Sequence, residues 1–218
     1  STPTVSSRFS LITAEEASGF AVEDIALDGN RENNTNINGN YAGGLWFQDC
    51  SNISLKNLDV RNYNGDGISF QICHDVSVEG CEIHNNADLG LHPGSGAQRP
   101  RLVNNHVSGS NIGIFFCWGV KYGLAEGNRL SDNNYGISIG HRDDENLIRN
   151  NDIQNSHTNG LVFRPERGEG FTAKGNRIEN NRIIDSGGDA GIAVDVQGVT
   201  ANNSLVRNTI KETRGPAQ

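Results

Sequence analysis

Short stretches in which apolar and polar residues alternate recur along the chain, and each stretch follows a glycine. Seven glycines mark the repeat, at a spacing of 23 residues four times and then of 24 and 31: Gly44, Gly67, Gly90, Gly113, Gly136, Gly160 and Gly191. Alternation with period two is typical of a β-strand with one buried face. We therefore expect a strand after each glycine, with the residues one and three places further on facing inward. These inward pairs are Leu45/Phe47, Ile68/Phe70, Leu91/Pro93, Ile114/Phe116, Ile137/Ile139, Leu161/Phe163 and Ile192/Val194.

A second short strand follows in most units and ends in the pattern Asn, any residue, aliphatic. The asparagines of this pattern are Asn105, Asn128, Asn151, Asn176 and Asn208, while the first two units have Leu58 and Cys81 instead. Stacked asparagines can hydrogen-bond the buried amides of successive bends. The pattern thus predicts an asparagine ladder along one corner of a solenoid.

About two dozen residues per unit, with two or three short strands and no helical stripe, suit one coil of a parallel β-helix. The chain has no leucine-rich-repeat core pattern, and a propeller blade needs about 40 residues. We expect an all-β fold, a single-stranded right-handed parallel β-helix of about seven coils. At a rise of about 4.8 Å per coil, such a rod is roughly 34 Å long.

The repeat leads us to expect one domain over residues 1–218. Within it, residues 1–19 are expected to form an N-terminal cap that includes a helical segment, LITAEEAS. Residues 20–43 are expected to be an irregular first coil, and residues 44–215 regular coils with an extruded loop near 164–175. No cap pattern follows the last coil, so an oligomer or further domains are expected at the uncapped ends.

Only 34% of residues are hydrophobic and 27 are glycine, which is low for a globular core but suits the thin interior of a β-helix. Of the four cysteines, Cys50 and Cys73 share the same offset in successive coils. A disulfide between stacked neighbours is geometrically possible. We expect free, buried thiols instead, because such thiols behave as small hydrophobes.

The net charge of −8 is unevenly distributed: residues 1–89 carry 4 basic and 13 acidic side chains, whereas residues 90–170 carry 8 of each. The middle of the rod therefore has no net negative charge that would repel an anionic ligand. No basic stripe with interleaved aromatic residues is present, which argues against nucleic acid as a partner. No apolar run is long enough to span a membrane, and no signal-peptide pattern is present.

Residues two and four places after each glycine are expected to face outward on a parallel sheet, where several could carry chemistry. His92 lies mid-strand and precedes a PGSGAQRP loop that contains Arg99. His141 is expected within about 10 Å of His92 by strand spacing. His92 and His141 are the candidate bases, although a stacked surface histidine and a turn residue are the plainer interpretations.

Arg164 and Glu166 flank Pro165 at the base of the long loop and join the candidate catalytic residues, although a surface ion pair explains them equally well. Gln71, Arg99, Trp118 and Arg142 are the candidate substrate-binding residues. A metal site is unknown from the sequence. Calcium is a possible cofactor through Asp143, Asp144 and Glu145, but adjacent acids point in different directions.

The units resemble those of the pectate-lyase-like superfamily of right-handed parallel β-helices from about Phe20 to Ile210. Within it, four strings are similar to bacterial right-handed β-helix-repeat proteins: GDGISFQ (65–71), LGLHPGSGAQRP (89–100), FFCWGVK (115–121) and GISIGHRDDEN (136–146). The superfamily contains polysaccharide lyases, epimerases, glycoside hydrolases and tailspikes, so the fold alone does not choose a reaction. The DPH string of alginate epimerases and the full residue set of polygalacturonases are absent.

The resemblance implies a protein that binds an extracellular polysaccharide along its parallel sheet, located outside the cell or in the periplasm. A lyase that cleaves uronic-acid-containing glycans by β-elimination needs a base and a cation, which His92, His141, Arg142 and Arg164 could supply. A glycoside hydrolase needs two carboxylates, for which Asp66 with Asp88, or Glu166 with Asp195, are candidates. A non-catalytic carbohydrate-binding or adhesive module is the third possibility, and exposed Trp46 and Phe115 would favour it.

Overall fold

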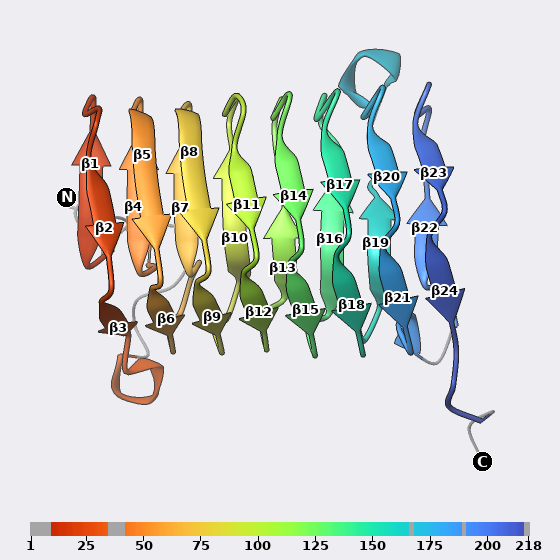
Figure 1. The fold of residues 1–218 in the computed structure, drawn as a ribbon, viewed down its shortest axis with the longest axis horizontal. Coiled ribbons are helices and arrows are strands. Elements are labelled where there is room, and N and C mark those ends of the chain that lie inside the picture. The colour runs from red at the N-terminus through yellow and green to blue at the C-terminus, as the bar shows by residue number, and fades with distance from the viewer. Residues whose placement is uncertain (1–9, 35–41, 166–167, 189–190, 216–218) are drawn as a thin grey trace.

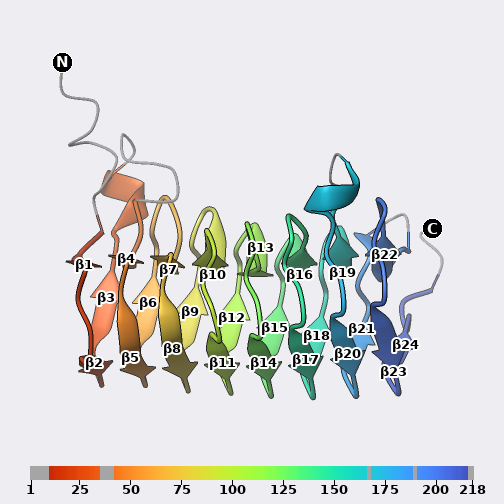
Figure 2. The same cartoon turned by 90° about the horizontal axis from the view of Figure 1, so that it is seen from above.

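Three parallel sheets, A, B and C, each of eight strands, build the molecule in a computed structural model that describes residues 10–34, 42–165, 168–188 and 191–215. The chain visits the sheets in turn, so each coil contributes one strand to each sheet, and the coils stack into a rod (Figure 1). Figure 2 shows sheet A along one side of the rod, sheet B along the opposite side and sheet C between them. The predicted all-β parallel solenoid is confirmed.

Sheet A consists of β1 (Ile12–Glu15), β4 (Leu45–Gln48), β7 (Ile68–Gln71), β10 (Leu89–Gly94), β13 (Ile112–Phe115), β16 (Tyr135–Ile139), β19 (Asn159–Phe163) and β22 (Val194–Val196). Sheet B consists of β2 (Ala21–Glu23), β5 (Ser51–Lys56), β8 (His74–Glu79), β11 (Arg101–Val103), β14 (Leu124–Glu126), β17 (Leu147–Arg149), β20 (Arg177–Glu179) and β23 (Ser204–Val206). Sheet C consists of β3 (Ala26–Asp28), β6 (Asp59–Arg61), β9 (Glu82–His84), β12 (His106–Ser108), β15 (Arg129–Ser131), β18 (Asp152–Gln154), β21 (Arg182–Ile184) and β24 (Thr209–Lys211). The 3-10 turns η1 (Arg31–Asn33) and η2 (Glu169–Phe171) project on the side of sheet A (Figure 2).

The interior is a set of apolar columns, because the strand pairing places equivalent residues of successive coils directly above one another. The inward residues of sheet A from Leu45 to Phe163 join the buried core as the alternation predicted, apart from Pro93, which is buried but outside the core cluster. Sheet B contributes the column Val22, Leu55, Val78, Leu102, Ala125, Ile148, Ile178 and Leu205. Sheet C contributes Leu27, Val60, Ile83, Val107, Leu130, Ile153, Ile183 and Ile210.

The repeating glycine has a packing reason. A Cβ atom added at Gly90 would lie 2.2 Å from the Cγ1 atom of Val107 and 2.7 Å from the carbonyl oxygen of Gly113. The inward side chains of sheet C therefore pack directly on the backbone at the start of sheet A. No larger residue fits this position without displacing either the core or the next coil.

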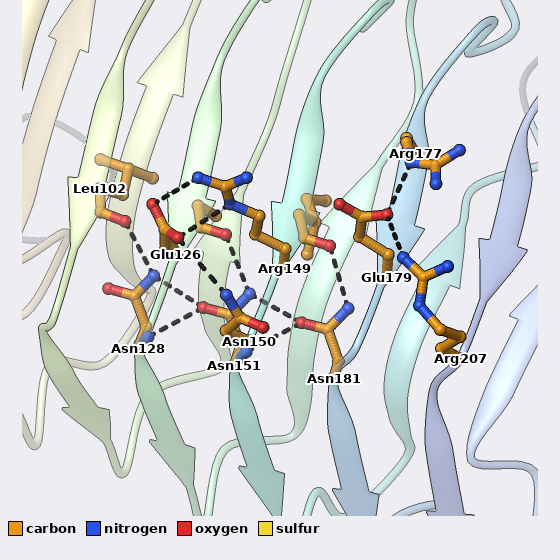
Figure 3. A network of polar contacts seen from close by, with 12 residues as sticks. Leu102, Glu126, Asn128, Arg149, Asn150, Asn151, Arg177, Glu179, Asn181 and Arg207 are labelled. Atoms are coloured by element: carbon orange, nitrogen blue, oxygen red, sulfur yellow. Dashed lines mark hydrogen bonds and ion pairs between the residues drawn. The ribbon is translucent and has the colours of Figure 1, made fainter.

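An asparagine ladder runs along the corner between sheets B and C (Figure 3). The side chain of Asn151 accepts hydrogen bonds from the backbone and side-chain amides of Asn128, both at 2.9 Å, and its own amide donates to the carbonyl of Ala125 at 3.0 Å. The same three contacts link Asn105 to Asn128. In the preceding coils, the Sγ atom of Cys81 takes the acceptor role, 3.5 Å from the backbone nitrogen of Leu58.

The ladder continues through Asn181 and not through Asn176, which corrects the predicted series. Asn151 donates to the Oδ1 atom of Asn181, and Asn181 donates to that of Asn208. Asn176 belongs to a second ladder, with Asn146 and Asn203, at the start of sheet B. The sequence NRIENNRII contains the same motif twice, so the motif alone does not choose between the two asparagines.

The expected N-terminal helix is a strand, within the residues that the structure describes. Ile12–Glu15 form β1, which pairs with β4 in the register Ile12 to Leu45 and Ala14 to Phe47. Ile12 and Ala14 pack against the core because alternate residues of this segment suit a strand better than a helix. The first coil thus has all three strands, and residues 1–9 of the expected cap lie outside the described residues.

The last coil is shifted by two residues from the glycine-based alignment. Leu161 pairs with Val194 and Phe163 with Val196, so the inward pair is Val194/Val196 and not Ile192/Val194. Ala193 takes the place of the repeating glycine, since its carbonyl accepts the hydrogen bonds of Gly160 and Leu161. The sequence does not reveal this shift, because the 31 residues between Gly160 and Gly191 contain an insertion whose position no motif marks.

We predict that Asn151→Ala destabilises the fold by roughly 2–5 kcal/mol, because it leaves the buried Asn128 amide and the Ala125 carbonyl without partners. Urea unfolding of parent and variant measures the difference. Asn134→Ala is the matched control, since the Asn134 side chain is exposed and its amide donates only to Asn111. Equal destabilisation by the two substitutions would contradict the structural role of the ladder.

All four cysteines are free and buried, as expected. Burial raises the pKa of the Cys73 thiol to about 12, so this thiol stays protonated and unreactive at neutral pH. We predict that a thiol reagent labels none of the four in the native protein within minutes and all four in denaturant. Rapid labelling of the native protein, or only two thiols after denaturation, would contradict these assignments.

Candidate active site on sheet A

The outward side chains in the middle of sheet A form a covered row and not an open surface. Ser69 and His92 lie on the adjacent strands β7 and β10, and Ser138 lies on β16; all three are outside the core cluster, yet all three are buried. Trp46 is buried as well, and Phe115 is half-buried. Neither Trp46 nor Phe115 is therefore exposed on this face, as an adhesive module would have required.

A buried carboxylate orients His92. The Nδ1 atom of His92 lies 2.8 Å from the Oδ2 atom of Asp66, which precedes β7, and 3.3 Å from the hydroxyl of Ser69. Asp66 is wholly buried, and its Oδ1 atom accepts the backbone N–H of Leu89. Burial raises the pKa of the Asp66 carboxyl, while the adjacent His92 acts against this shift. An Nδ1–H that donates to Asp66 leaves Nε2 as the proton-accepting nitrogen of a neutral His92.

Gln71 completes the arrangement around His92. Its side-chain amide donates to the Ser69 hydroxyl at 3.0 Å and lies across β10 at Gly94. A Cβ atom at Gly94 would lie 2.4 Å from the Oε1 atom of Gln71, so a larger residue there would displace the Gln71 amide. Gln71 is therefore linked to His92 through the Ser69 hydroxyl and not directly.

Phe115 connects His92 to Arg164. The ring centroids of His92 and Phe115 are 5.2 Å apart, and the guanidinium carbon of Arg164 lies 4.5 Å from the Phe115 centroid. Arg164 follows β19 and crosses β16, donating to the Ser138 hydroxyl and to the Phe116 carbonyl, both at 2.9 Å. Phe115 therefore separates the candidate base from this cation.

Arg164 forms an ion pair with a buried carboxylate, with its Nη2 atom 3.3 Å from the Oδ2 atom of Asp143. Asp143 also accepts three backbone hydrogen bonds, from Gly119, Val120 and Gly140. Burial nevertheless raises the pKa of Asp143 to about 6. The contacts of Arg164 make it a structural clamp on the turn after β16, a role that the sequence alone did not reveal.

Trp118 and His141 stack at the edge where sheet A turns toward sheet B. Their ring centroids are 4.9 Å apart, with an interplanar angle of 19°, and 61% of the Trp118 surface is exposed. Both residues have left-handed backbone conformations, with φ of 70° and 45°, which turn their side chains out of the strand direction. His141 is thus part of an aromatic platform with Trp118.

Arg142 extends this platform toward the long loop. Its guanidinium lies 4.3 Å from the ring centroid of Phe171, and its Nε atom donates to the carbonyl of Gly170 at 2.9 Å. Trp118, His141, Arg142 and Phe171, which we call the edge platform, come from three successive coils. Phe171 was absent from the sequence-based candidates because no repeat position marks a loop residue.

Two of the candidate site residues, Arg99 and Glu166, are not part of the arrangement around His92 that the structure describes. Arg99 forms a bidentate ion pair with Asp75, at 2.7 and 2.8 Å, and is not in contact with His92. The pair explains why the pKa of Asp75 is lowered. Glu166 lies outside the described residues.

The three acids considered for calcium lie in different environments. Asp143 is fully occupied by its four donors, and Asp144 pairs with Lys121 at 2.9 Å and accepts the Lys174 backbone N–H. Glu145 is exposed, and its backbone has a left-handed conformation. The part of the chain that the structure describes contains no group of three His, Cys, Asp or Glu side chains that could hold a metal ion.

The family profile described as "Right handed beta helix region" matches residues 25–210. The chain belongs to this right-handed β-helix family. The resemblance to right-handed parallel β-helix proteins noted in the sequence is thereby confirmed. No functionally curated protein matches the chain. Among the described residues of this β-helix protein, no helix has the length and apolarity to cross a bilayer.

Two solved structures are similar to this β-helix. An alginate lyase from Paenibacillus sp. str. FPU-7 shows 14% identity and a TM-score of 0.48, over 80% of this chain and 76% of that one. The A-module of the mannuronan C-5 epimerase AlgE6 from Azotobacter vinelandii shows 17% identity and a TM-score of 0.47, over 94% of this chain and 76% of that one. Similarity at this level does not bear on the activity of this chain.

We predict that Arg164→Ala destabilises the protein by roughly 3–5 kcal/mol at neutral pH, because it leaves the buried Asp143 carboxylate unpaired. Since the folded-state pKa of Asp143 is raised, its contribution to stability is greatest at low pH and falls as the pH rises through about 6. Without Arg164 this fall extends to higher pH. The loss of stability should therefore be larger at pH 8 than at pH 5, as measured by thermal and urea unfolding.

Arg182→Ala is the control for this prediction, because Arg182 forms an exposed ion pair with Asp152. Its effect should be smaller and nearly independent of pH over the same range. A loss of stability by Arg164→Ala that is equal at the two pH values would argue against the ion pair with Asp143.

Proposed function

We propose that the protein binds an acidic polysaccharide along the outer side of sheet A and cleaves it by β-elimination. The observation that carries this proposal is the Asp66–His92 pair, in which a buried carboxylate 2.8 Å from Nδ1 fixes the ring of a histidine that points to the outer side of sheet A and is 4% exposed. In this proposal the protein binds the polysaccharide outside the cell or in the periplasm.

His92 acts as the base in this proposal. Elimination from a uronate begins with removal of the proton on the carbon next to the carboxylate, so the base must be neutral and correctly oriented. Asp66 selects the tautomer with the proton on Nδ1 and stabilises the imidazolium that forms. The Nε2 atom of His92 has no hydrogen-bond partner among the described residues, and it is not fully enclosed by the protein.

The edge platform binds the sugar chain. Exposed Trp118, held in place by stacking on His141, offers a flat face on which a pyranose ring can pack. Trp118 follows the strand adjacent to β10, about three residues further along than His92, which corresponds to roughly 10 Å. One bound oligosaccharide can therefore contact both the platform and His92.

Arg142 is the cation proposed to neutralise the substrate carboxylate. Among the described residues, Arg142 donates hydrogen bonds from its Nε atom and its backbone amide, and its side chain is exposed beside the platform. Arg164, the cation expected from the sequence, is instead committed to Asp143, Ser138 and the Phe116 carbonyl. Its charge acts on the ligand only from behind Phe115.

The hydrolase alternative has less support from the described residues. It needs two carboxylates with room for a sugar between them. In the first candidate pair, Asp66 is bound to His92 and is not directed with Asp88 toward a sugar. In the second, Asp195 accepts a hydrogen bond from Gln197, and Glu166 lies outside the described residues. Calcium is the cofactor that we test with the proposed lyase.

The test is elimination activity on polymers of mannuronate, guluronate, galacturonate and glucuronate, with and without Ca²⁺, followed by the ultraviolet absorbance of the unsaturated product. We predict that His92→Ala lowers kcat by about 10²–10⁴-fold, as expected for loss of a general base. Asp66→Asn should also lower kcat. Trp118→Ala should mainly raise KM, by roughly tenfold, because it removes a binding contact of about 1.4 kcal/mol.

His106→Ala is the matched control. The Nδ1 atom of His106 lies 2.9 Å from the Oε2 atom of Glu82, which is a similar pair on sheet C, so this variant should keep full activity. Activity of His92→Ala equal to the parent would reject His92 as the base. New reducing ends without an unsaturated product would indicate hydrolysis, and binding without either product would indicate a non-catalytic module.

A further inference from the structure

The rod ends in two bare edges, within the residues that the structure describes. Strands β1, β2 and β3 are the outermost strands of sheets A, B and C at one end, and β22, β23 and β24 are outermost at the other. The core columns are open at the second end, where Val196, Leu205 and Ile210 are 51%, 44% and 49% exposed. Unpaired edge strands with apolar side chains are templates for another strand.

The two edges match in register. If the stacking continues by one coil, Val194 and Val196 of β22 lie over Ile12 and Ala14 of β1 in a second copy. By the same step Leu205 meets Val22, and Ile210 meets Leu27. Every core column of the three sheets is therefore continued by a small or medium aliphatic residue, as it is inside the rod.

The charges of the two ends are complementary. The first coil holds six acidic side chains and one arginine: Glu15, Glu16, Glu23, Asp24, Asp28, Glu32 and Arg31. The last coil holds three basic and two acidic side chains: Arg207, Lys211, Arg214, Asp195 and Glu212. Association of the two ends thus brings an acidic edge onto a weakly basic one.

This complementarity extends to individual positions. Asp24 and Arg207 are the left-handed residues that follow the sheet B strand in the first and last coils, with φ of 56° and 54°. Asp28 and Lys211 likewise end the sheet C strands β3 and β24. One further step of stacking therefore places Arg207 over Asp24 of a second copy, and Lys211 over its Asp28. Inside the rod the same kind of contact joins Arg61 to Asp28 and Arg149 to Glu126.

We propose that the protein associates head to tail with a second copy of itself, so that β22, β23 and β24 pair in parallel with β1, β2 and β3 of that copy. The contact uses different surfaces on the two molecules, so it does not close and extends into filaments. The polysaccharide-facing sides of sheet A would then join into one long face.

The first experiment measures the mass of the parent protein against concentration and salt by sedimentation. The mass should rise with concentration and fall with added salt, because part of the attraction is between exposed charges. Arg207→Glu/Lys211→Glu should raise the concentration needed for association by roughly tenfold or more, because like charges then face each other. Arg101→Glu/Arg129→Glu is the matched control, with the same change in net charge on the middle coils, and it should associate more like the parent.

A mixing experiment tests the polarity of the contact. Asp24→Arg/Asp28→Lys gives the first coil the residues that the last coil carries at equivalent positions, so this variant should also fail to associate alone. Mixed in equal amounts, the two end-reversed variants should associate, because each acidic end then meets a basic end. Thermal unfolding verifies that each variant is folded.

If the first-coil variant does not fold, Val196→Lys/Ile210→Lys replaces it, because these side chains are exposed in the single molecule and their change should abolish association. The proposal is overturned if the parent stays monomeric at all concentrations and salt levels. It is equally overturned if the folded end variants associate like the parent, or if the mixture of reversed variants stays monomeric.

Discussion

The structure depends on a hydrogen-bonding constraint at its corners. A coil of about 23 residues turns three times, and each turn buries backbone amides that no strand can pair. The side chain of the next coil supplies the missing acceptor, as Asn151 does for Asn128 and Asn86 does for Tyr63. Since each corner is completed by its neighbour, a coil has no stable structure alone, and stability comes from stacking.

The same constraint shapes the candidate site. Corners between sheets B and C are filled by the ladder and stay short in every coil, so this edge offers little variation. The turn after sheet A instead varies in length before it reaches the second ladder, and there Trp118, His141 and Arg142 adopt left-handed conformations that direct side chains outward. The outer face of sheet A combines a rigid strand frame with a variable edge, which is an arrangement suited to holding reactive groups.

The fold was readable from the sequence because its determinants are periodic. Ile68 and Phe70, or Ile137 and Ile139, reveal both the strand and its inward face without any knowledge of tertiary contacts. Errors occurred where the period fails, at Gly191 after an insertion and at Asn176, where the motif occurs twice. The first strand was missed because β1 follows no glycine of the series.

The site was less readable, because its contacts join residues that share no repeat position. The outward direction of His92 followed from alternation, but its partner Asp66 sits in a turn 26 residues earlier. The clamp between Arg164 and Asp143 crosses three strands of sheet A and depends on side-chain length, which no spacing rule records. The stacking of His141 on Trp118 depends on left-handed backbone conformations that strand counting does not predict.

The repeating glycines of sheet A have a consequence for how such a chain can evolve. The backbone at Gly67 meets the carbonyl of Gly90 in the way that the backbone at Gly90 meets the carbonyl of Gly113. Duplication or deletion of one whole 23-residue unit therefore recreates the same joint at the new boundary. The length of the sheet A face can change in steps of about 4.8 Å, close to the length of one sugar unit, without any redesign of the interior.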